Sequence, residues 1–260
     1  MSYADVNGLS LHYEEHGEGE VPLILLHGGF GLGAMFEPLL PALTQGRRVV
    51  TVDLQGHGGT ADVDRPLRAE TLGDDVAALI EHLGVEQADV FGYSLGGFVA
   101  FQTAIRHPDR VRRLVVVSAT LRRDGSYPEV LAAMQHINGQ AAEHMKDSPM
   151  YEAYAAIAPR VEDWTTLGDK TGDLLRQDFD WIADAGKITA PVLLVFADAD
   201  TARYEHVVEM LRAFGGAQGD PGWDGSGGRG TAQLAILPGH THYDVWMSPL
   251  LPPTVNAFLS

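Results

Sequence analysis

Short apolar runs recur along the chain, and most are separated by segments with helical spacing. The runs contain few polar residues, and a strand without polar alternation is usually buried on both faces, as in a parallel sheet. They predict strands at 21–26, 48–54, 88–91, 112–118, 191–196 and 233–237. This alternation of strands and helices indicates an α/β fold in which a mostly parallel central sheet carries helices on both faces.

The predicted helices have apolar residues spaced three or four positions apart. In 71–83 this spacing places the apolar residues on one face and Asp74, Asp75 and Glu81 elsewhere. Near the N-terminus, Asn7-Gly8 separates two strand-like runs, which predicts a tight hairpin. The predicted helices span 35–43, 71–83, 97–107 and 255–259.

Residues 119–187 break the alternation, because they contain no strand signal and are rich in Met, Tyr and Trp. A stretch of this length is far longer than an ordinary connection between a strand and a helix. We therefore expect 119–187 to form a helical cap, inserted into an α/β core made of 1–118 and 188–260. Most of the aromatic side chains in the cap should pack its interior, and a minority should line a pocket.

The glycine-rich residues 215–230 form a second irregular stretch, which predicts a surface loop. Glycine-rich loops can hold phosphate groups. Here the Gly-Lys-Ser/Thr pattern is absent and no predicted strand directly precedes the loop, so we expect no phosphate site.

Composition narrows the function classes. The 260 residues are 45% apolar, contain no cysteine and carry a formal charge of −17. The lack of cysteine excludes disulfides, thiolate metal sites and a cysteine nucleophile, and the charge argues against nucleic acid or an anionic membrane as the main partner. With no apolar run near the roughly 20 residues of a membrane span and no signal-peptide pattern, we expect a cytoplasmic protein with a small-molecule partner. The oligomeric state stays open.

A Gly-x-Ser-x-Gly pattern at 92–96 joins a predicted strand to a predicted helix. This is the context of a nucleophile elbow, in which a sharp turn presents a serine hydroxyl. The serine backbone is strained there, so the residues two positions away must lack side chains, and Gly92 and Gly96 meet that demand. The amides that follow Ser94 lie at a helix N-terminus, where they can donate to an oxyanion.

A serine hydroxyl needs a base to remove its proton, and the resulting imidazolium needs a carboxylate. Candidates for both follow Ser94 at the ends of predicted strands, as Ala-Asp-Ala-Asp at 197–200 and Pro-Gly-His-Thr-His at 238–242. Because the carboxyl ends of parallel strands meet at one edge of a sheet, we expect these side chains to converge. The chain order is Ser, Asp, His.

Taken together, these motifs resemble the α/β-hydrolase superfamily, and in particular its serine-nucleophile branch of esterases and lactonases with a helical cap. The resemblance covers nearly the whole chain and implies the α/β-hydrolase fold. The matching segments are 27–29, 53–58, 92–97, 107–111, 198–200 and 238–242.

The resemblance assigns a role to each residue of the predicted triad. It makes Ser94 the nucleophile, Asp200 the acid and His242 the base. Asp198 stays an alternative acid, which otherwise caps the loop backbone, and His240 stays an alternative base.

The resemblance also implies an oxyanion hole and a pocket. The oxyanion donors are the amides of Leu95 and Gly29, with Phe30 as the alternative to Gly29, while His27 and His57 hold loops near the site. No metal and no cofactor are expected. The candidate pocket residues are Phe30, Met35, Tyr93, Met134, Met150, Tyr154, Trp164 and Trp181.

These roles imply a serine hydrolase that cleaves an ester, lactone or related acyl bond of a small molecule through an acyl-serine. Alternatives on the same fold are C–C bond hydrolysis, cofactor-free perhydrolysis and acyl transfer, and a more distant one is a non-catalytic small-molecule receptor. Haloalkane dehalogenases and epoxide hydrolases of this fold carry an aspartate where Ser94 stands, so the chain resembles neither.

The choice between the two histidines can be tested by substitution. His242→Ala should lower turnover of an ester substrate by several orders of magnitude, because the base is lost, whereas His240→Ala should leave most of it. Steady-state kinetics of the two variants decide the assignment, and the reverse result would make His240 the base.

Overall fold

The computed structural model describes residues 2–228 and 230–260, which fold around an eight-stranded sheet of order β1-β2-β4-β3-β5-β6-β7-β8. From β4 to β8 neighbouring strands are parallel, while β1 and β2 pair antiparallel and β2 runs antiparallel to β4. The prediction of a mostly parallel sheet is confirmed. The strands are β1 Ser2–Val6, β2 Leu9–His16, β3 Leu23–Leu26, β4 Val49–Val52, β5 Ala88–Tyr93, β6 Val111–Val117, β7 Val192–Ala199 and β8 Ala232–Thr241.

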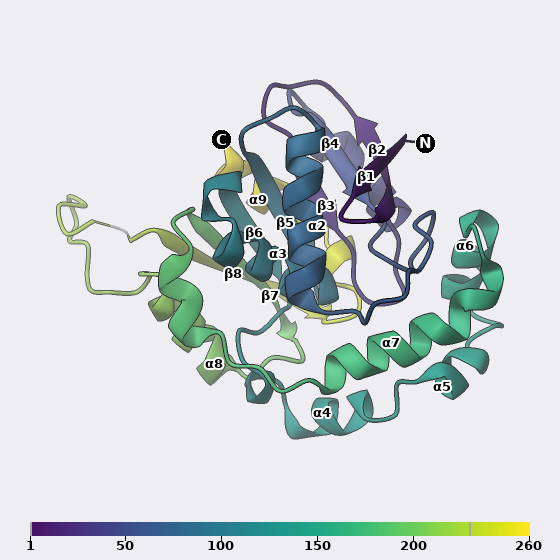
Figure 1. The fold of residues 1–260 in the computed structure, drawn as a ribbon. Coiled ribbons are helices and arrows are strands. Elements are labelled where there is room, and N and C mark those ends of the chain that lie inside the picture. The colour runs from purple at the N-terminus through teal and green to yellow at the C-terminus, as the bar shows by residue number, and fades with distance from the viewer. Residues whose placement is uncertain (1, 229) are drawn as a thin grey trace.

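Helices cover both faces of the sheet, as Figure 1 shows. One face packs against α2 (Ala69–His82), α3 (Leu95–Arg106) and α8 (Tyr204–Ala213). The other face packs against the 3₁₀ helix η1 (Gly33–Leu39), the short α1 (Leu40–Leu43) and α9 (Leu251–Leu259). The sheet is therefore the middle layer of three.

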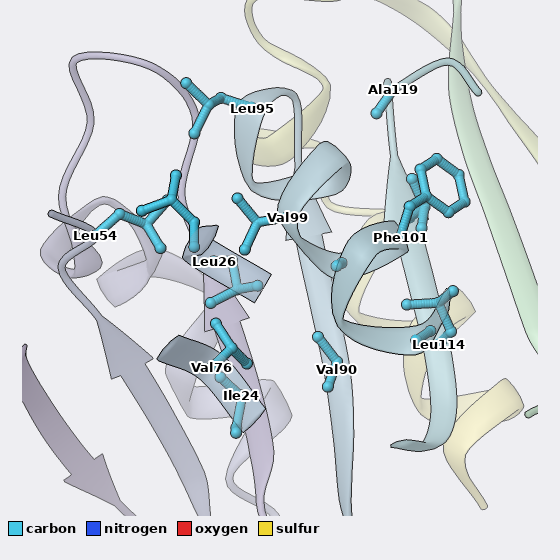
Figure 2. Close-up of a cluster of buried hydrophobic side chains, with 14 of the residues drawn as sticks. Ile24, Leu26, Leu54, Val76, Val90, Leu95, Val99, Phe101, Leu114 and Ala119 are labelled. Atoms are coloured by element: carbon cyan, nitrogen blue, oxygen red, sulfur yellow. The ribbon is translucent and has the colours of Figure 1, made fainter. Parts of the chain in front are cut away.

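The two hydrophobic cores explain why the strand sequences are apolar without alternation. In β3, Ile24 and Leu26 point to the core under α2 and α3, while Leu23 and Leu25 point to the core under α9. Figure 2 shows the first of these cores, where side chains of α2 and α3 meet those of β3, β5 and β6. Burying one such side chain contributes roughly 1.5–3 kcal/mol.

The hairpin predicted at Asn7-Gly8 is confirmed. It joins β1 to β2, and both turn residues have positive φ angles, 49° at Asn7 and 79° at Gly8. Two-residue turns of this type match the twist of the strands, and Asn-Gly adopts them at low cost.

Three elements differ from the sequence prediction. The helix expected at 35–43 is a 3₁₀ helix that contains Pro38, followed by one turn of α-helix, because proline lacks the N–H that a longer helix needs. Strand β8 extends well beyond the predicted 233–237. Helix α8 was not predicted, although its Val207 and Met210 are buried in the core.

Between β6 and β7 the chain forms a series of helices and no named strand, and all of its residues are described. We call α4 to α7 the helical arc, because in Figure 1 they curve past the ends of α2 and α3. Whether the arc is a separate cap domain stays a prediction. Its helices are α4 Pro128–Met134, α5 Gly139–Glu143, α6 Pro149–Ile157 and α7 Trp164–Arg176.

The interior of the helical arc is built around the fully buried Trp164. Its ring lies 5.3 Å from Tyr151, 5.0 Å from Tyr154 and 5.3 Å from Phe30, measured between ring centroids. Its indole N–H donates to the carbonyl of Ala142 at 2.7 Å. Because Phe30 belongs to the loop after β3, this aromatic cluster also joins the arc to the rest of the protein.

Lys170 on α7 ties the helical arc to the loop that follows β4. Its ammonium donates to the carboxylate of Asp62 at 2.6 Å and to the carbonyls of Val63 and Arg65 at 2.7 and 2.8 Å. The side-chain amide of Gln55 donates to the same three residues from the other side. The loop is thus held between Gln55 and Lys170.

The glycine-rich stretch forms no helix or strand at residues 215–228 and 230, and most of these residues are exposed. Among the described helices, none is both long and apolar enough to cross a membrane.

Replacing Lys170 should loosen the helical arc. Lys170→Met removes three hydrogen bonds from a partly buried charge, so the free energy of unfolding should fall by about 1–3 kcal/mol and the melting temperature by roughly 3–10 °C. Amide hydrogen exchange in α7 should accelerate more than exchange in β5. Lys146→Met is the matched control, because this exposed lysine forms an ion pair with Glu143 three residues away and lies 5.9 Å from the ring centroid of Tyr151, and its melting temperature should change little. Equal effects of the two substitutions would contradict the anchoring role.

Candidate active site

The turn between β5 and α3 holds Ser94 in a backbone conformation that side chains rarely adopt, with φ 54° and ψ −116°. Such strain costs about 1–3 kcal/mol and persists only where the surroundings enforce it. A Cβ atom on Gly92 would lie 2.1 Å from the carbonyl oxygen of Gly96, and one on Gly96 would lie 2.2 Å from that of Leu26. The turn therefore closes only with glycine at both positions.

The hydroxyl of Ser94 faces the imidazole of His242. The distance from Ser94 Oγ to His242 Nε2 is 3.0 Å, and the distance from His242 Nδ1 to Asp200 Oδ1 is 3.2 Å. Tyr93 donates its hydroxyl to the carbonyl of His242 at 2.7 Å, which holds the backbone of the histidine loop against β5. With the ring proton on Nδ1, Nε2 is free to accept the proton of Ser94.

The side chain of Asp200 is only 1% exposed, yet its carboxylate is ionised. Burial opposes ionisation, but the hydrogen bond and charge of His242 and the donors on the other carboxylate oxygen outweigh it, so the pKa of Asp200 lies below its ordinary value. Oδ2 accepts the Ser118 hydroxyl and the Ala197 amide, and Oδ1 accepts the Thr201 amide at 2.7 Å. The carboxylate is thus fixed in orientation and charge.

Asp198 and His240 lie close to this group, but within the described part of the chain the Ser94 hydroxyl pairs with His242 and with neither of them. Asp198 is exposed, and its Oδ1 accepts the backbone amides of Gly239 and His240 at 2.9 and 3.1 Å. The Gly239 amide is the main reason that the pKa of Asp198 is lowered. The ring of His240 faces Asp244 at 3.4 Å. Asp198 thus shapes the turn that leads to His242.

The loop after β3 lies next to the start of α3. A Cβ atom on Gly29 would lie 3.7 Å from Leu95 Cδ1 and 3.6 Å from Thr171 Cγ2 of α7. Among the described residues, the amides of Gly29, Phe30 and Leu95 donate to no backbone carbonyl. These N–H groups are therefore candidates for binding a ligand, and Thr171 of α7 lies close to the loop that carries two of them.

His27 and His57 are fully buried and hold two loops below the site. His27 donates from Nδ1 to the carbonyl of Gly28 at 2.7 Å and accepts the amide of Leu54 at 3.1 Å. Burial is the largest cause that lowers the pKa of His57, to about 3, and burial also lowers the pKa of His27. Both rings bond to backbone groups of these loops, His57 through Nδ1 to the carbonyl of Gln55 at 3.0 Å.

The candidate pocket residues lie in several separate parts of the structure. Phe30, Tyr154 and Trp164 belong to the aromatic cluster of the arc. Met35 lies beside Gly31, with Sδ 3.2 Å from a Cβ atom placed there. Tyr93 is buried beneath His242.

The other three candidates lie on the arc and its return to the sheet. Met134 is half-buried at the end of α4, and Met150 on α6 is 46% exposed. Trp181 lines a surface pocket of about 480 Å³ together with Lys187, and Ser94 is not part of its lining. Which of the candidate side chains contact a substrate stays a prediction.

Two polar residues at the site were missed by the sequence analysis, Ser118 and Thr201. Ser118 follows β6, has a φ angle of 54° and donates to Asp200. Thr201 contacts both Asp200 and His242. A polar residue directly after a buried parallel strand was an available signal for Ser118, since such positions face the edge of the sheet where the other site residues lie.

Comparison with known proteins gives matches along the chain. A family model described as the alpha/beta hydrolase fold matches residues 21–143. The chain is 36% identical over 207 residues to a pimeloyl-[acyl-carrier protein] methyl ester esterase of Neisseria meningitidis serogroup B (strain H44/76), covering 72% of this chain and 78% of that protein.

Solved structures match over nearly the full length. The enol-lactonase from Burkholderia xenovorans LB400 superposes with a TM-score of 0.72 at 25% identity, covering 99% of each chain. A thermophilic esterase from Thermogutta terrifontis superposes with a TM-score of 0.73 at 21% identity, covering 99% of this chain and 96% of that one.

The two aspartates should respond differently to truncation. Asp200→Ala leaves His242 without its carboxylate and should lower kcat by roughly 10³–10⁴-fold, whereas Asp198→Ala should change kcat by less than about tenfold and act mainly on the melting temperature. Alanine is preferred to asparagine, because both oxygens of Asp200 accept a backbone amide and an NH₂ group would face one of them. Similar losses of kcat in the two variants would contradict this assignment.

Proposed function

The chain belongs to the α/β-hydrolase family, and from this premise we propose that it is a serine hydrolase that cleaves an ester, lactone or related acyl bond of a small molecule. The observation that carries the proposal is the contact of Ser94 with His242 and of His242 with Asp200. The methyl ester esterase and the enol-lactonase that resemble the chain support the class of bond.

In the proposed acylation step, Ser94 Oγ attacks the carbonyl carbon of the substrate while Nε2 of His242 takes the hydroxyl proton. The carbonyl oxygen becomes an oxyanion, and the amides of Leu95 and Gly29 donate to it. His242 then returns the proton to the leaving oxygen, the bond between carbon and that oxygen breaks, and an acyl-serine remains.

Deacylation repeats these steps with water. His242 takes a proton from a water molecule, whose oxygen attacks the acyl carbon. Collapse of the second tetrahedral intermediate returns the proton to Ser94 and releases the carboxylic acid. Throughout, the ionised Asp200 stabilises the imidazolium that forms on His242.

The arrangement accounts for a large part of a typical rate enhancement. A positioned base contributes about 10²–10⁴-fold, and each oxyanion donor lowers the barrier by roughly 3 kcal/mol. The strained turn at Ser94 keeps both effects in place before substrate binds, because the hydroxyl and the Leu95 amide belong to consecutive residues.

We further propose that residues 119–187 act as a cap which selects the acyl group. The position of Thr171 beside Gly29 supports this proposal. A Cβ atom placed on Gly29 would lie 3.6 Å from Thr171 Cγ2, so α7 runs close to the loop that we propose binds the substrate carbonyl. A small-molecule substrate fits the charge of −17, which disfavours nucleic acid and anionic membranes. A cytoplasmic location stays a prediction.

Covalent labelling tests the proposal directly. A fluorophosphonate should add one phosphonyl group to the wild-type chain, found by mass spectrometry on the peptide that contains Ser94. Ser94→Ala should abolish the label, and the control Ser10→Ala, an exposed serine of β2, should keep it. An unlabelled wild type would refute a serine hydrolase, and a label that survives Ser94→Ala would refute the nucleophile.

Activity on different substrates distinguishes ester hydrolysis from C–C hydrolysis and perhydrolysis. A short p-nitrophenyl ester should be hydrolysed by the wild type and not by Ser94→Ala. Greater activity towards a vinylogous diketone or in a peracid assay would favour C–C hydrolysis or perhydrolysis instead.

A further inference from the structure

The Nδ1 atom of His242 has two acceptors within reach. Asp200 Oδ1 lies at 3.2 Å, and Thr201 Oγ1 lies closer, at 3.0 Å. The usual N–H···O distance is about 2.9–3.0 Å. By distance, the hydroxyl is therefore at least as good a partner for the ring proton as the carboxylate.

Thr201 is fixed in this position by its backbone. Its amide donates to Asp200 Oδ1 at 2.7 Å, and its carbonyl accepts the amide of Tyr127 at 3.1 Å. Its hydroxyl lies 3.3 Å from Asp200 Oδ1. The hydroxyl therefore lies within reach of both His242 and Asp200.

The neighbours of Asp200 explain why a second acceptor matters. Oδ1 already accepts the Thr201 amide over a shorter distance than the one to His242, and Oδ2 is occupied by Ser118 and Ala197. Each of these donors draws negative charge from the carboxylate. A hydroxyl that accepts from Nδ1 and donates to Oδ1 forms a second route between the ring and the same charge.

We propose that Thr201 is a positioning residue that shares the Nδ1 proton of His242 with Asp200, a role that rests on the proposed serine hydrolase function. A carboxylate oxygen can only accept, so in the bond between the Thr201 hydroxyl and Asp200 Oδ1 the hydroxyl donates its one proton. Thr201 Oγ1 can therefore only accept from the ring, which requires the proton on Nδ1 and leaves Nε2 unprotonated towards Ser94. Thr201 thus favours the same ring tautomer as the ionised Asp200 does.

Three variants test the role. Thr201→Val removes the hydroxyl and keeps the branched shape, while Thr201→Ser keeps the hydroxyl. Thr254→Val is the matched control, since it also removes one threonine hydroxyl that bonds to protein, here from Thr254 on α9 to the carbonyl of Leu250. All are made in the full chain, and melting temperatures check that each variant folds.

We expect kcat to fall only in the variant that lacks the hydroxyl at position 201. Thr201→Val should lower kcat for a p-nitrophenyl ester by roughly tenfold with KM unchanged, a part of the roughly 10⁴-fold that a lost acid costs. Thr201→Ser should stay within about threefold of the wild type, and Thr254→Val should match it. A kcat of Thr201→Val equal to the wild type would overturn the proposal, as would an equal loss in Thr201→Ser.

Proton NMR reads the hydrogen bond without substrate. The Nδ1–H resonance of His242, identified by its loss in His242→Gln, should move downfield in Thr201→Val, because the proton then bonds to the carboxylate alone. An unmoved resonance would overturn the sharing. Failure of the proposed function is distinguished by fluorophosphonate: an unlabelled wild type refutes the hydrolase, whereas normal labelling with an unmoved resonance refutes only the role of Thr201.

Discussion

The site depends on the absence of two side chains at one turn. At the end of β5 the backbone meets the first turn of α3, and the first turn of α3 meets the end of β3, with no space for a Cβ atom at Gly92 or Gly96. This close approach forces the positive φ angle of Ser94 and presents its hydroxyl beyond the edge of the sheet. It also places the Leu95 amide at the start of a helix, beside the loop of Gly29.

The order of the strands in the sheet brings the other site residues close to Ser94. Strands β5, β6 and β7 are parallel neighbours, so Ser94, Ser118 and Asp200 follow three adjacent strand ends, and His242 follows the fourth. Because the carboxyl ends of parallel strands share one edge, residues separated by up to 148 positions come within hydrogen-bond distance. The triad geometry is thus a property of the whole sheet rather than of any one loop.

The sequence was sufficient for the fold class, because unbroken apolar runs require two covered faces and Asn-Gly requires a tight hairpin. It also nominates Ser94, an aspartate at 198 or 200 and a histidine at 240 or 242, because these residues follow predicted strands. The choice of Asp200 and His242, which the structure brings close to Ser94, comes from the resemblance. The sequence was insufficient to separate His240 from His242, since the turn between them is shaped by Asp198, a contact between segments distant in the chain.

The sequence also does not predict the site residues whose contacts depend on which strands are neighbours. Ser118 and Thr201 belong to no motif. A polar residue directly after a buried strand is a signal for Ser118, but its contact with Asp200 follows from the position of β6 beside β7. The apolar pattern of helix α8 is weak, because only a narrow stripe of the helix is buried. That stripe consists of His206, Val207 and Met210. The pocket candidates stayed undecided because the packing of α4 to α7 against the core sets which side chains turn inward.

The position of β8 has a consequence for how the protein loses activity. This strand is last in the sheet, pairs only with β7, and presents exposed side chains such as Ile236, which is 44% exposed. Ser94 follows β5, deep in the sheet, whereas His242 follows this edge. Local opening has the lowest free energy where burial is least. Fraying of one edge strand would therefore separate the base from the nucleophile while the core stays folded, so catalytic competence is a more fragile property than the fold.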